Sequence, residues 1–361
     1  MKNISYAPII KTSDAEIRGI ENLDDDDKDG ITPIFELTKS RKSKYLPQGD
    51  IYRRLEKLKD VFGARRFILD LTSDRNSINE QIEELQDNHG GYKNWIDFLI
   101  LQKNDFPELI PTIQITDKGV KTEEELYNRV KVQVEALNRN FAEVAYRFPL
   151  EYEDFTTDLK HIIDNISKDK IICIVDAGFI TQGKSGIYIT KARSVIAEVK
   201  KFGIKNIILS ATSFPRNPTQ YGGEETGECQ LEECLFYNGA REEKSNISFI
   251  YGDYATINPI RSDQAGGNGW VPRIDMPTED ELFYYRSRKR KQELTYANAY
   301  TRVAHSVASD QRYKNIKKKI RDCWGIEQIE LAAKGTPEGL SPSFWISVRM
   351  NIHITIKNKM H

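Results

Sequence analysis

Polar or charged side chains occur at or near the ends of eight short apolar segments of this sequence. They are Lys11, Glu36, Asp70, Gln114, Arg147, Asp176, Ser213 and Asp253. Carboxylates and cations that share a cavity can carry out acid–base chemistry on a sugar, or hold a metal and a phosphate. Such mixed charges also shift one another's pKa values, as general acids and bases require. The alternative interpretation is that these residues form internal salt bridges or a solvated rim.

Roles in this chemistry can be assigned by residue type. The candidate acid–base or metal-binding groups are Glu36, Asp70, Asp176 and Asp253, and His353 joins them if the C-terminal tail folds over the site. The candidate substrate-binding residues are Lys11, Gln114, Arg147, Ser213, Tyr254 and Arg349, with Lys11 and Arg147 as the anion-binding groups. No cofactor is identifiable, and no metal is assigned.

The segment Lys170–Phe179 (KIICIVDAGF) shows what positions these side chains. Five apolar residues run without interruption and end at Asp176. A continuous apolar run has no polar face, so it predicts a strand buried on both sides, which is typical of a parallel sheet covered by helices. Strands of this kind are predicted at Tyr6–Lys11, Ile31–Leu37, Phe67–Leu71, Leu109–Ile115, Phe141–Phe148, Lys170–Phe179, Ile207–Ser213 and Ile247–Tyr254.

Helical patterns separate these strands, the clearest being the amphipathic segment 122–137. Eight strand–helix units predict an α/β protein with a (β/α)8 TIM-like barrel, in which all strand ends point into one site. A doubly wound open sheet is the alternative, but it usually has fewer strands and a glycine-rich first turn that is absent here. We expect the barrel to occupy residues 1–260, and the glycines of the loop 216–229 to suit a mobile flap.

Residues 261–361 have a different character and are predicted to form a C-terminal appendage that packs on the barrel. A β-hairpin or an extended segment is expected at 273–288, helices at 293–308 and 313–323, and an apolar tail at 342–356. Two basic runs, Arg286–Lys291 and Lys314–Arg321, lie near tyrosines and could bind a nucleic-acid backbone. A solvated helix face is the commoner explanation of such runs.

Composition limits the class of protein. The formal net charge of −1 gives no global signal for nucleic acid or an anionic membrane. No segment reaches the roughly 18 apolar residues that span a bilayer, so no membrane association is expected. The N-terminal segment lacks the features of a secretory signal, and Cys173 lies inside an apolar strand, as expected of a reduced thiol. We therefore expect a cytoplasmic protein.

The acidic segment Asp25–Glu36 matches the EF-hand calcium loop, with acidic residues at alternate positions, Gly30 and a terminal Glu36. Pro33 falls inside the loop, however, and position eight is Thr32 rather than an aliphatic residue. Glu36 is also needed on the second strand. An acidic solvated loop is the preferred interpretation.

Several short motifs carry a resemblance to a known family. They are YAPIIK at 6–11, TPIFEL at 32–37, SFP at 213–215, YGDY at 251–254 and FWISVRMNIHI at 344–354. In these motifs the chain resembles the beta family proteins of bacteria and phages. The resemblance implies a phage-conflict context and supplies no reaction. Where a paired histidine would be expected in the last motif, Ile352 precedes His353.

Two functional hypotheses follow. The first is a hydrolase-like enzyme of anti-phage defence, in which the barrel residues act on a phosphorylated, nucleotide or nucleic-acid substrate. Glycosidic hydrolysis by two of the carboxylates is a further form of this hypothesis. The second is a non-enzymatic module that binds a phage component or a partner protein from a defence operon, since a barrel fold does not dictate a function.

Overall fold

The computed structural model describes residues 5–217, 219–242, 246–260 and 269–361. Within these residues, eight parallel strands form one sheet in the order β4-β3-β2-β1-β9-β7-β6-β5. They are β1 (Tyr6–Lys11), β2 (Ile34–Leu37), β3 (Phe67–Leu71), β4 (Leu109–Pro111), β5 (Val144–Pro149), β6 (Ile171–Phe179), β7 (Asn206–Thr212) and β9 (Ser248–Asp253). A bridge from Thr112 to Ala145 joins the two edge strands. The predicted TIM-like barrel is confirmed.

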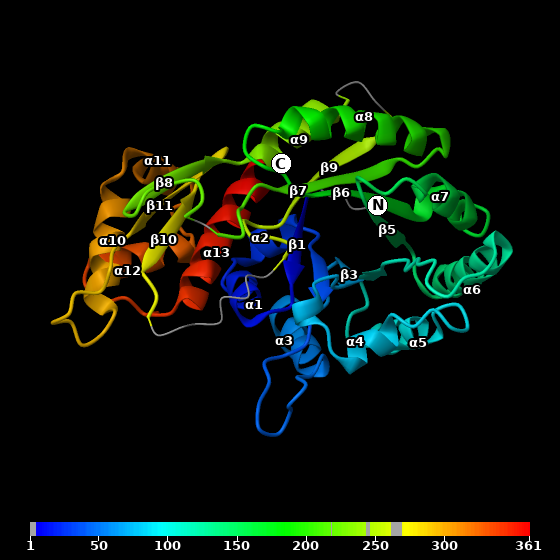
Figure 1. Cartoon of the computed structure of the whole chain (residues 1–361), viewed down its shortest axis with the longest axis horizontal. Helices are drawn as coiled ribbons and strands as arrows, with labels where there is room; N and C mark the ends of the chain where they lie inside the picture. The colour runs from blue at the N-terminus through cyan, green and yellow to red at the C-terminus, as the bar shows by residue number, and fades with distance from the viewer. Residues whose placement is uncertain (1–4, 218, 243–245, 261–268) are drawn as a thin grey trace.

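Helices cover the outside of the barrel (Figure 1). In chain order they are α1 (Asp14–Glu21), α3 (Tyr52–Phe62), α4 (Glu80–Leu85), α5 (Lys93–Gln102), α6 (Glu123–Asn140), α7 (Phe155–Ile163), α8 (Ser185–Lys201) and α9 (Glu232–Ala240). Their apolar faces pack on the outward-facing side chains of the strands in the large core. Short 3₁₀ turns lie at Arg75–Ser77 and Lys168–Lys170.

The inside of the barrel is a separate, mostly aliphatic core. Alternate residues of each strand point inward, as the two-residue period of a strand requires. The inward aliphatic residues are Ile9, Ile34, Ile68, Ile110, Ile172, Ile174, Ile208 and Ile250, with Ala7, Ala145 and Tyr254 in the same cluster. This packing fills the N-terminal part of the barrel. The polar residues near the C-terminal strand ends therefore lie next to a layer of buried apolar side chains.

A smaller unit lies beside the barrel (Figure 1). It contains an antiparallel sheet in the order β10-β11-β8 and its own apolar core. Its elements are β8 (Thr226–Gln230), β10 (Arg273–Pro277), β11 (Glu281–Arg286), α10 (Ala297–Ser309), α11 (Gln311–Lys319) and α12 (Trp324–Ala333). The loop 216–229, which we expected to be a flap, instead contributes β8 to this sheet. Hydrogen bonding to β11 explains the difference, since it pairs Cys229 with Leu282.

Helix α13 (Pro342–Met360) joins the two units. Figure 1 shows it running between the barrel and the smaller sheet. Met350 and Ile354 belong to the barrel core, whereas Val348 and Ile352 belong to the core of the smaller unit. The tail therefore takes the place of the helix that follows the last barrel strand. Among the described residues, no helix is long and apolar enough to cross a membrane.

Candidate active site at the mouth of the barrel

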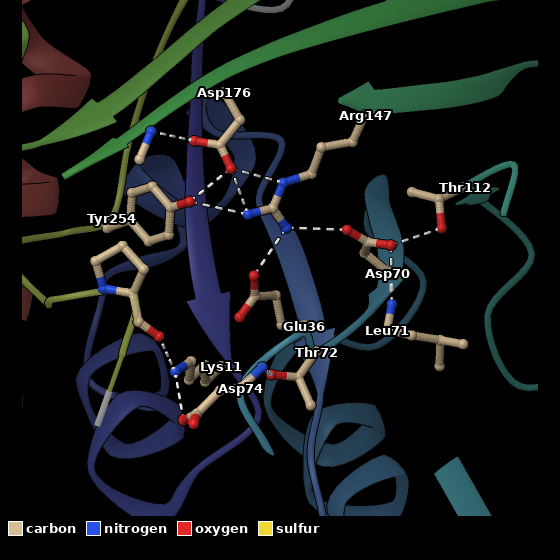
Figure 2. Close-up of polar contacts among 12 residues, drawn as sticks. Lys11, Glu36, Asp70, Leu71, Thr72, Asp74, Thr112, Arg147, Asp176 and Tyr254 are labelled. Carbon is tan, nitrogen blue, oxygen red and sulfur yellow. Dashed lines mark hydrogen bonds and ion pairs between the residues drawn. The ribbon is translucent and has the colours of Figure 1, made fainter. Parts of the chain in front are cut away.

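Arg147 is the centre of a polar cluster at the C-terminal end of the barrel strands (Figure 2). Its Nε and Nη2 donate to Asp176 Oδ2 at 3.0 and 2.7 Å, and Nη2 also donates to the Tyr254 hydroxyl at 2.9 Å. Its Nη1 donates to Glu36 Oε1 at 2.8 Å and to Asp70 Oδ2 at 2.9 Å. A guanidinium has five N–H groups, and these five bonds match that number.

Strand register brings these residues together. Lys11 pairs with Glu36, and Glu36 pairs with Asp70, across neighbouring parallel strands. Because paired residues of parallel strands point the same way, their side chains lie in one layer of the barrel. Arg147 reaches this layer from β5 and Asp176 from β6. The structure therefore brings together six of the predicted site residues, namely Glu36, Asp70, Gln114, Arg147, Asp176 and Tyr254.

Further hydrogen bonds fix the two aspartates in place. Asp70 Oδ1 accepts from Thr112 Oγ1 at 2.9 Å, from Gln114 Nε2 at 3.1 Å and from the backbone N–H of Leu71 at 2.9 Å. Asp176 accepts from the Tyr254 hydroxyl at 2.6 Å and from the N–H of Gly178 at 2.9 Å. Carboxylates that accept several bonds are held rigidly in one orientation. Sequence analysis missed Thr112, although a hydroxyl after an apolar run at a strand end was a usable signal.

Lys11 forms a neighbouring pair rather than joining Arg147. Its Nζ donates to Asp74 Oδ2 at 2.9 Å and to the carbonyl of Pro259. Burial acts to raise the pKa of Asp74, but the hydrogen bond and charge of Lys11 hold that pKa below its usual value. Asp74 was not among the predicted residues because it follows the strand in the sequence instead of lying on it.

The mouth carries more negative than positive charge. Two cations, Lys11 and Arg147, face the four carboxyl groups of Glu36, Asp70, Asp74 and Asp176. Burial raises the pKa of Glu36, and Arg147 and Lys11 only partly oppose that rise. Glu36 therefore keeps its proton to a higher pH than an ordinary glutamate. The arrangement provides a proton donor beside carboxylates that are ion-paired to a guanidinium.

The cluster is nearly closed to solvent and borders an open cleft. The exposed fraction of the side chain is 14% for Arg147, 11% for Asp176 and 4% for Glu36. Beside it lies a cleft of about 1030 Å³, formed by the loops after β3 and β4 and by α6. Gln114 lines this cleft and also donates to Asp70. Gln114 therefore connects the cleft to the mouth.

The other predicted site residues form a second buried cluster, so our expectation of one shared site was wrong for them. Asp253 binds His353 Nε2 at 2.6 Å and accepts from the Tyr6 hydroxyl at 2.8 Å. Ser213 Oγ donates to Glu233 at 2.6 Å. Within the described residues, no hydrogen bond or ion pair joins these groups to Arg147.

Arg349 lies with this second group. Its Nη1 donates to Asp275 at 2.7 Å, its Nε donates to Thr256 at 3.0 Å, and its guanidinium lies 4.0 Å from the centre of the Phe214 ring. Both Arg349 and His353 come from α13, which packs outside the barrel. The tail thus delivers its polar residues to the outer side of the last strands and not to the mouth.

Strand alternation explains the split. Tyr254 belongs to the inner core of the barrel, and Tyr251 belongs to the outer core. Asp253 is two residues from Tyr251, so it shares the outward face of β9. A one-residue difference in register exchanges the two faces of a strand. Tyr254, and not Asp253, is therefore the residue of the YGDY motif that reaches the mouth.

The acidic segment forms helix α2 (Asp25–Gly30), and Glu36 lies on β2 as expected. Asp27 accepts from Thr355 Oγ1 at 2.6 Å and from Asn358 Nδ2 at 2.9 Å. Asp25 and Asp29 bind Arg65. Among the described residues, no group of three or more acidic, histidine or cysteine side chains is placed to hold a metal ion.

We therefore expect neither calcium nor a chelator to shift the melting temperature of the protein. Differential scanning fluorimetry with CaCl₂ or EDTA measures this directly. A calcium-dependent rise in the melting temperature that is lost in Asp27→Ala would contradict the expectation, because the loop would then need to rearrange around an ion.

Comparison with known proteins identifies the family. The family model described as Beta protein matches residues 6–357. The chain is 28% identical over 358 residues to Protein beta of Enterobacteria phage P4, which covers 98% of this chain and 92% of that protein.

Solved structures with a similar trace include the cellulose synthase subunit Z of Clostridioides difficile and the spore cortex-lytic enzyme SleL of Bacillus megaterium. The first is 12% identical and covers 73% of this chain and 94% of its own, with a TM-score of 0.38. The second is 12% identical and covers 97% of this chain and 74% of its own, with a TM-score of 0.39. Similarity at this level carries no argument about activity. The family model spans nearly all of the sequence, and it shows that the chain belongs to the Beta protein family.

Proposed function

We propose that the mouth of the barrel is a hydrolytic acid–base site that cleaves a glycosidic bond. One observation carries this proposal: the carboxyl groups around Arg147 outnumber the cations, and the guanidinium already makes five hydrogen bonds to the protein. Glycosidic cleavage passes through a transition state with positive charge on the sugar. A fixed excess of negative charge stabilises such a transition state.

The roles of the carboxyl groups follow from their surroundings. Glu36 is the proton donor to the leaving group, because its raised pKa keeps the acid form available. Asp176 and Asp70 are the ionised partners that stabilise the sugar cation or orient water, since Arg147 binds both. Tyr254 holds Asp176 through its hydroxyl. Asp253 and His353 have no part in this step and support the strand from outside.

The geometry argues against direct anion binding at the mouth. Lys11 is occupied by Asp74 and the Pro259 carbonyl, and Arg147 by its carboxylates and Tyr254. A phosphate placed here would meet surplus negative charge and would need to displace these bonds. We therefore propose that the bond cleaved lies in the neutral sugar portion of the substrate. The relative from phage P4 connects the family to a phage, and a phage-conflict setting for this activity is part of the proposal.

The test is turnover by the purified protein and by Glu36→Gln. Free base released from ribonucleotides is measured by liquid chromatography, and p-nitrophenol released from p-nitrophenyl glycosides is measured by absorbance. We expect Glu36→Gln to lose about a hundredfold in rate, the contribution typical of a general acid. Glu108→Gln, which changes an exposed glutamate, is the matched control. Equal rates for Glu36→Gln and wild type would refute the proposed acid.

A non-enzymatic binding module is the second candidate, and one observation favours it. The charges of the mouth are paired with one another and mostly buried, as in a structural network. Arg288 and Lys318 on the smaller unit are exposed instead. If plating efficiency of a sensitive phage depends on these residues and not on Asp176, the binding module is supported. Asp176→Asn and the pair Arg288→Glu and Lys318→Glu separate the two cases.

A further inference from the structure

We infer that the cleft beside the mouth binds the phosphate of a nucleotide whose sugar lies against Glu36 and Asp176. This inference rests on the proposed function and names its substrate class. The cleft is formed at the C-terminal side of β3 and β4, where barrel enzymes bind their ligands. Its volume of about 1030 Å³ is enough for a nucleotide.

The cleft and the mouth are continuous through one side chain. Gln114 lines the cleft and donates to both Asp70 and Thr112. Its backbone N–H already donates to Gln133 Oε1 at 2.8 Å and is therefore not available to donate to a ligand. The side chain is therefore the boundary between the two regions. A substrate that reaches Glu36 from solvent along this route would leave part of itself in the cleft.

The cleft contains more cationic than acidic side chains, in contrast to the mouth, where carboxyl groups outnumber cations. Its lining contains Arg75, Lys118 and Arg129 against Glu83 and Asp87. Arg75 and Lys118 are exposed and have no ion pair in the described part of the chain. Arg129 donates to Glu125 through Nη2, and its buried Nη1 has no partner there. Free N–H donors on arginine and lysine are the usual ligands of a phosphate.

The two regions together select one kind of molecule. The surplus carboxylates of the mouth suit a neutral sugar that becomes positive, whereas the free cations of the cleft suit a group that is already negative. A nucleotide has both parts within one molecule. Its phosphate is then held by Arg75 and Lys118 while its glycosidic carbon faces Glu36, and water replaces the base at that carbon as the base leaves with a proton from Glu36.

The experiment is a calorimetric titration with ribose 5-phosphate, which contains the sugar and the phosphate whatever the base. Ribose is the matched ligand without the charge. We expect ribose 5-phosphate to bind at least about tenfold more tightly than ribose, as charge-assisted hydrogen bonds imply. In Arg75→Gln combined with Lys118→Gln, the two affinities should become equal. Arg139→Gln combined with Lys334→Gln removes the same charge from exposed positions outside the cleft and should leave binding unchanged.

The outcomes separate this inference from the proposed function. The cleft is not a phosphate site if ribose 5-phosphate binds to the wild-type protein no more tightly than ribose does. The same conclusion follows if ribose 5-phosphate binds to the Arg75 and Lys118 double variant as tightly as to the wild-type protein. Either result would overturn this inference even if glycosides are hydrolysed. If binding depends on these two residues but Glu36→Gln releases base as fast as wild type, the phosphate site stands and the proposed acid fails. Circular dichroism of each variant confirms that it is folded.

Discussion

Replacement of Arg147 by methionine is expected to lower the free energy of unfolding by about 3–5 kcal/mol, the cost typical of removing one partner from a buried charge network. The variant leaves Glu36, Asp70 and Asp176 facing one another without their shared counter-charge. Methionine has a similar length and fills the same space, so lost packing contributes little. Urea denaturation at neutral pH measures the change.

The pH dependence distinguishes this electrostatic cause from a general loss of packing. The folded-state pKa of Glu36 is already raised, so its contribution to stability is fully present below its unfolded value of 4.5 and is lost as pH rises through the folded value. Without Arg147, the carboxylates of Asp70 and Asp176 lose their shared counter-charge, and protonation at low pH relieves the repulsion between them. The difference in the free energy of unfolding between the wild type and Arg147→Met should therefore become smaller as the pH is lowered.

The control for this variant is Arg65→Met, which breaks surface pairs with Asp25 and Asp29. Exposed pairs contribute less than about 1 kcal/mol, so this variant should stay close to wild type. If Arg147→Met is no less stable than Arg65→Met, the buried network is not a source of stability. A loss that does not change with pH would assign the effect to packing.

The barrel and most of its mouth could be predicted because both depend on local rules. An uninterrupted apolar run that is rich in β-branched residues, such as 171–175, is typical of a strand covered on both sides. The polar residue that ends such a run must lie where the strand leaves the core. Glu36, Asp70 and Asp176 follow from this rule, and parallel register then places them near Arg147.

The parts that could not be predicted depend on contacts between distant segments. Nothing in YGDY indicates which of Asp253 and Tyr254 faces inward, because register is set by the neighbouring strands. Strand β8 exists only because β11 provides its hydrogen-bonding partner. Helix α13 is apolar on several faces, and the sequence does not show that it packs between two cores.

The two polar clusters have different physical designs, and this difference supports different roles. The mouth borders a cleft, carries surplus negative charge and contains a carboxyl group with a raised pKa. The pair of Asp253 and His353 is fully buried. Burial acts to raise the pKa of Asp253, but its interactions with His353, the N–H of Ala255 and Lys357 together hold that pKa below its usual value. The first has the features of a reaction site, and the second those of a structural link between α13 and the barrel.

Replacement of Asp253 by alanine is expected to destabilise the protein by about 3–5 kcal/mol, because it leaves several buried donors without an acceptor. Those donors are the Tyr6 hydroxyl at 2.8 Å, the N–H of Ala255 at 2.8 Å and His353 Nε2 at 2.6 Å. Asp253→Asn keeps an acceptor oxygen for two of them and should cost less. Urea denaturation of both variants, with Asp105→Ala as an exposed control, measures this order.

The histidine gives the prediction a pH signature of known sign. His353 Nδ1 is buried and has no partner in the described structure, so a second proton there would be an unsatisfied donor. Burial accordingly lowers the pKa of His353. Asp253 acts to raise that pKa, whereas the positive charges of Lys357 and Arg349 lower it further. A lowered pKa means that stability is present above the unfolded value of 6.5 and falls as the pH drops below it. Asp253→Ala removes the opposing charge, so the pKa of His353 should fall further and the loss of stability should continue to lower pH. In His353→Gln, the free energy of unfolding should no longer fall in this way as the pH drops below 6.5. If this variant shows the same pH dependence as the wild type, His353 is not the group responsible.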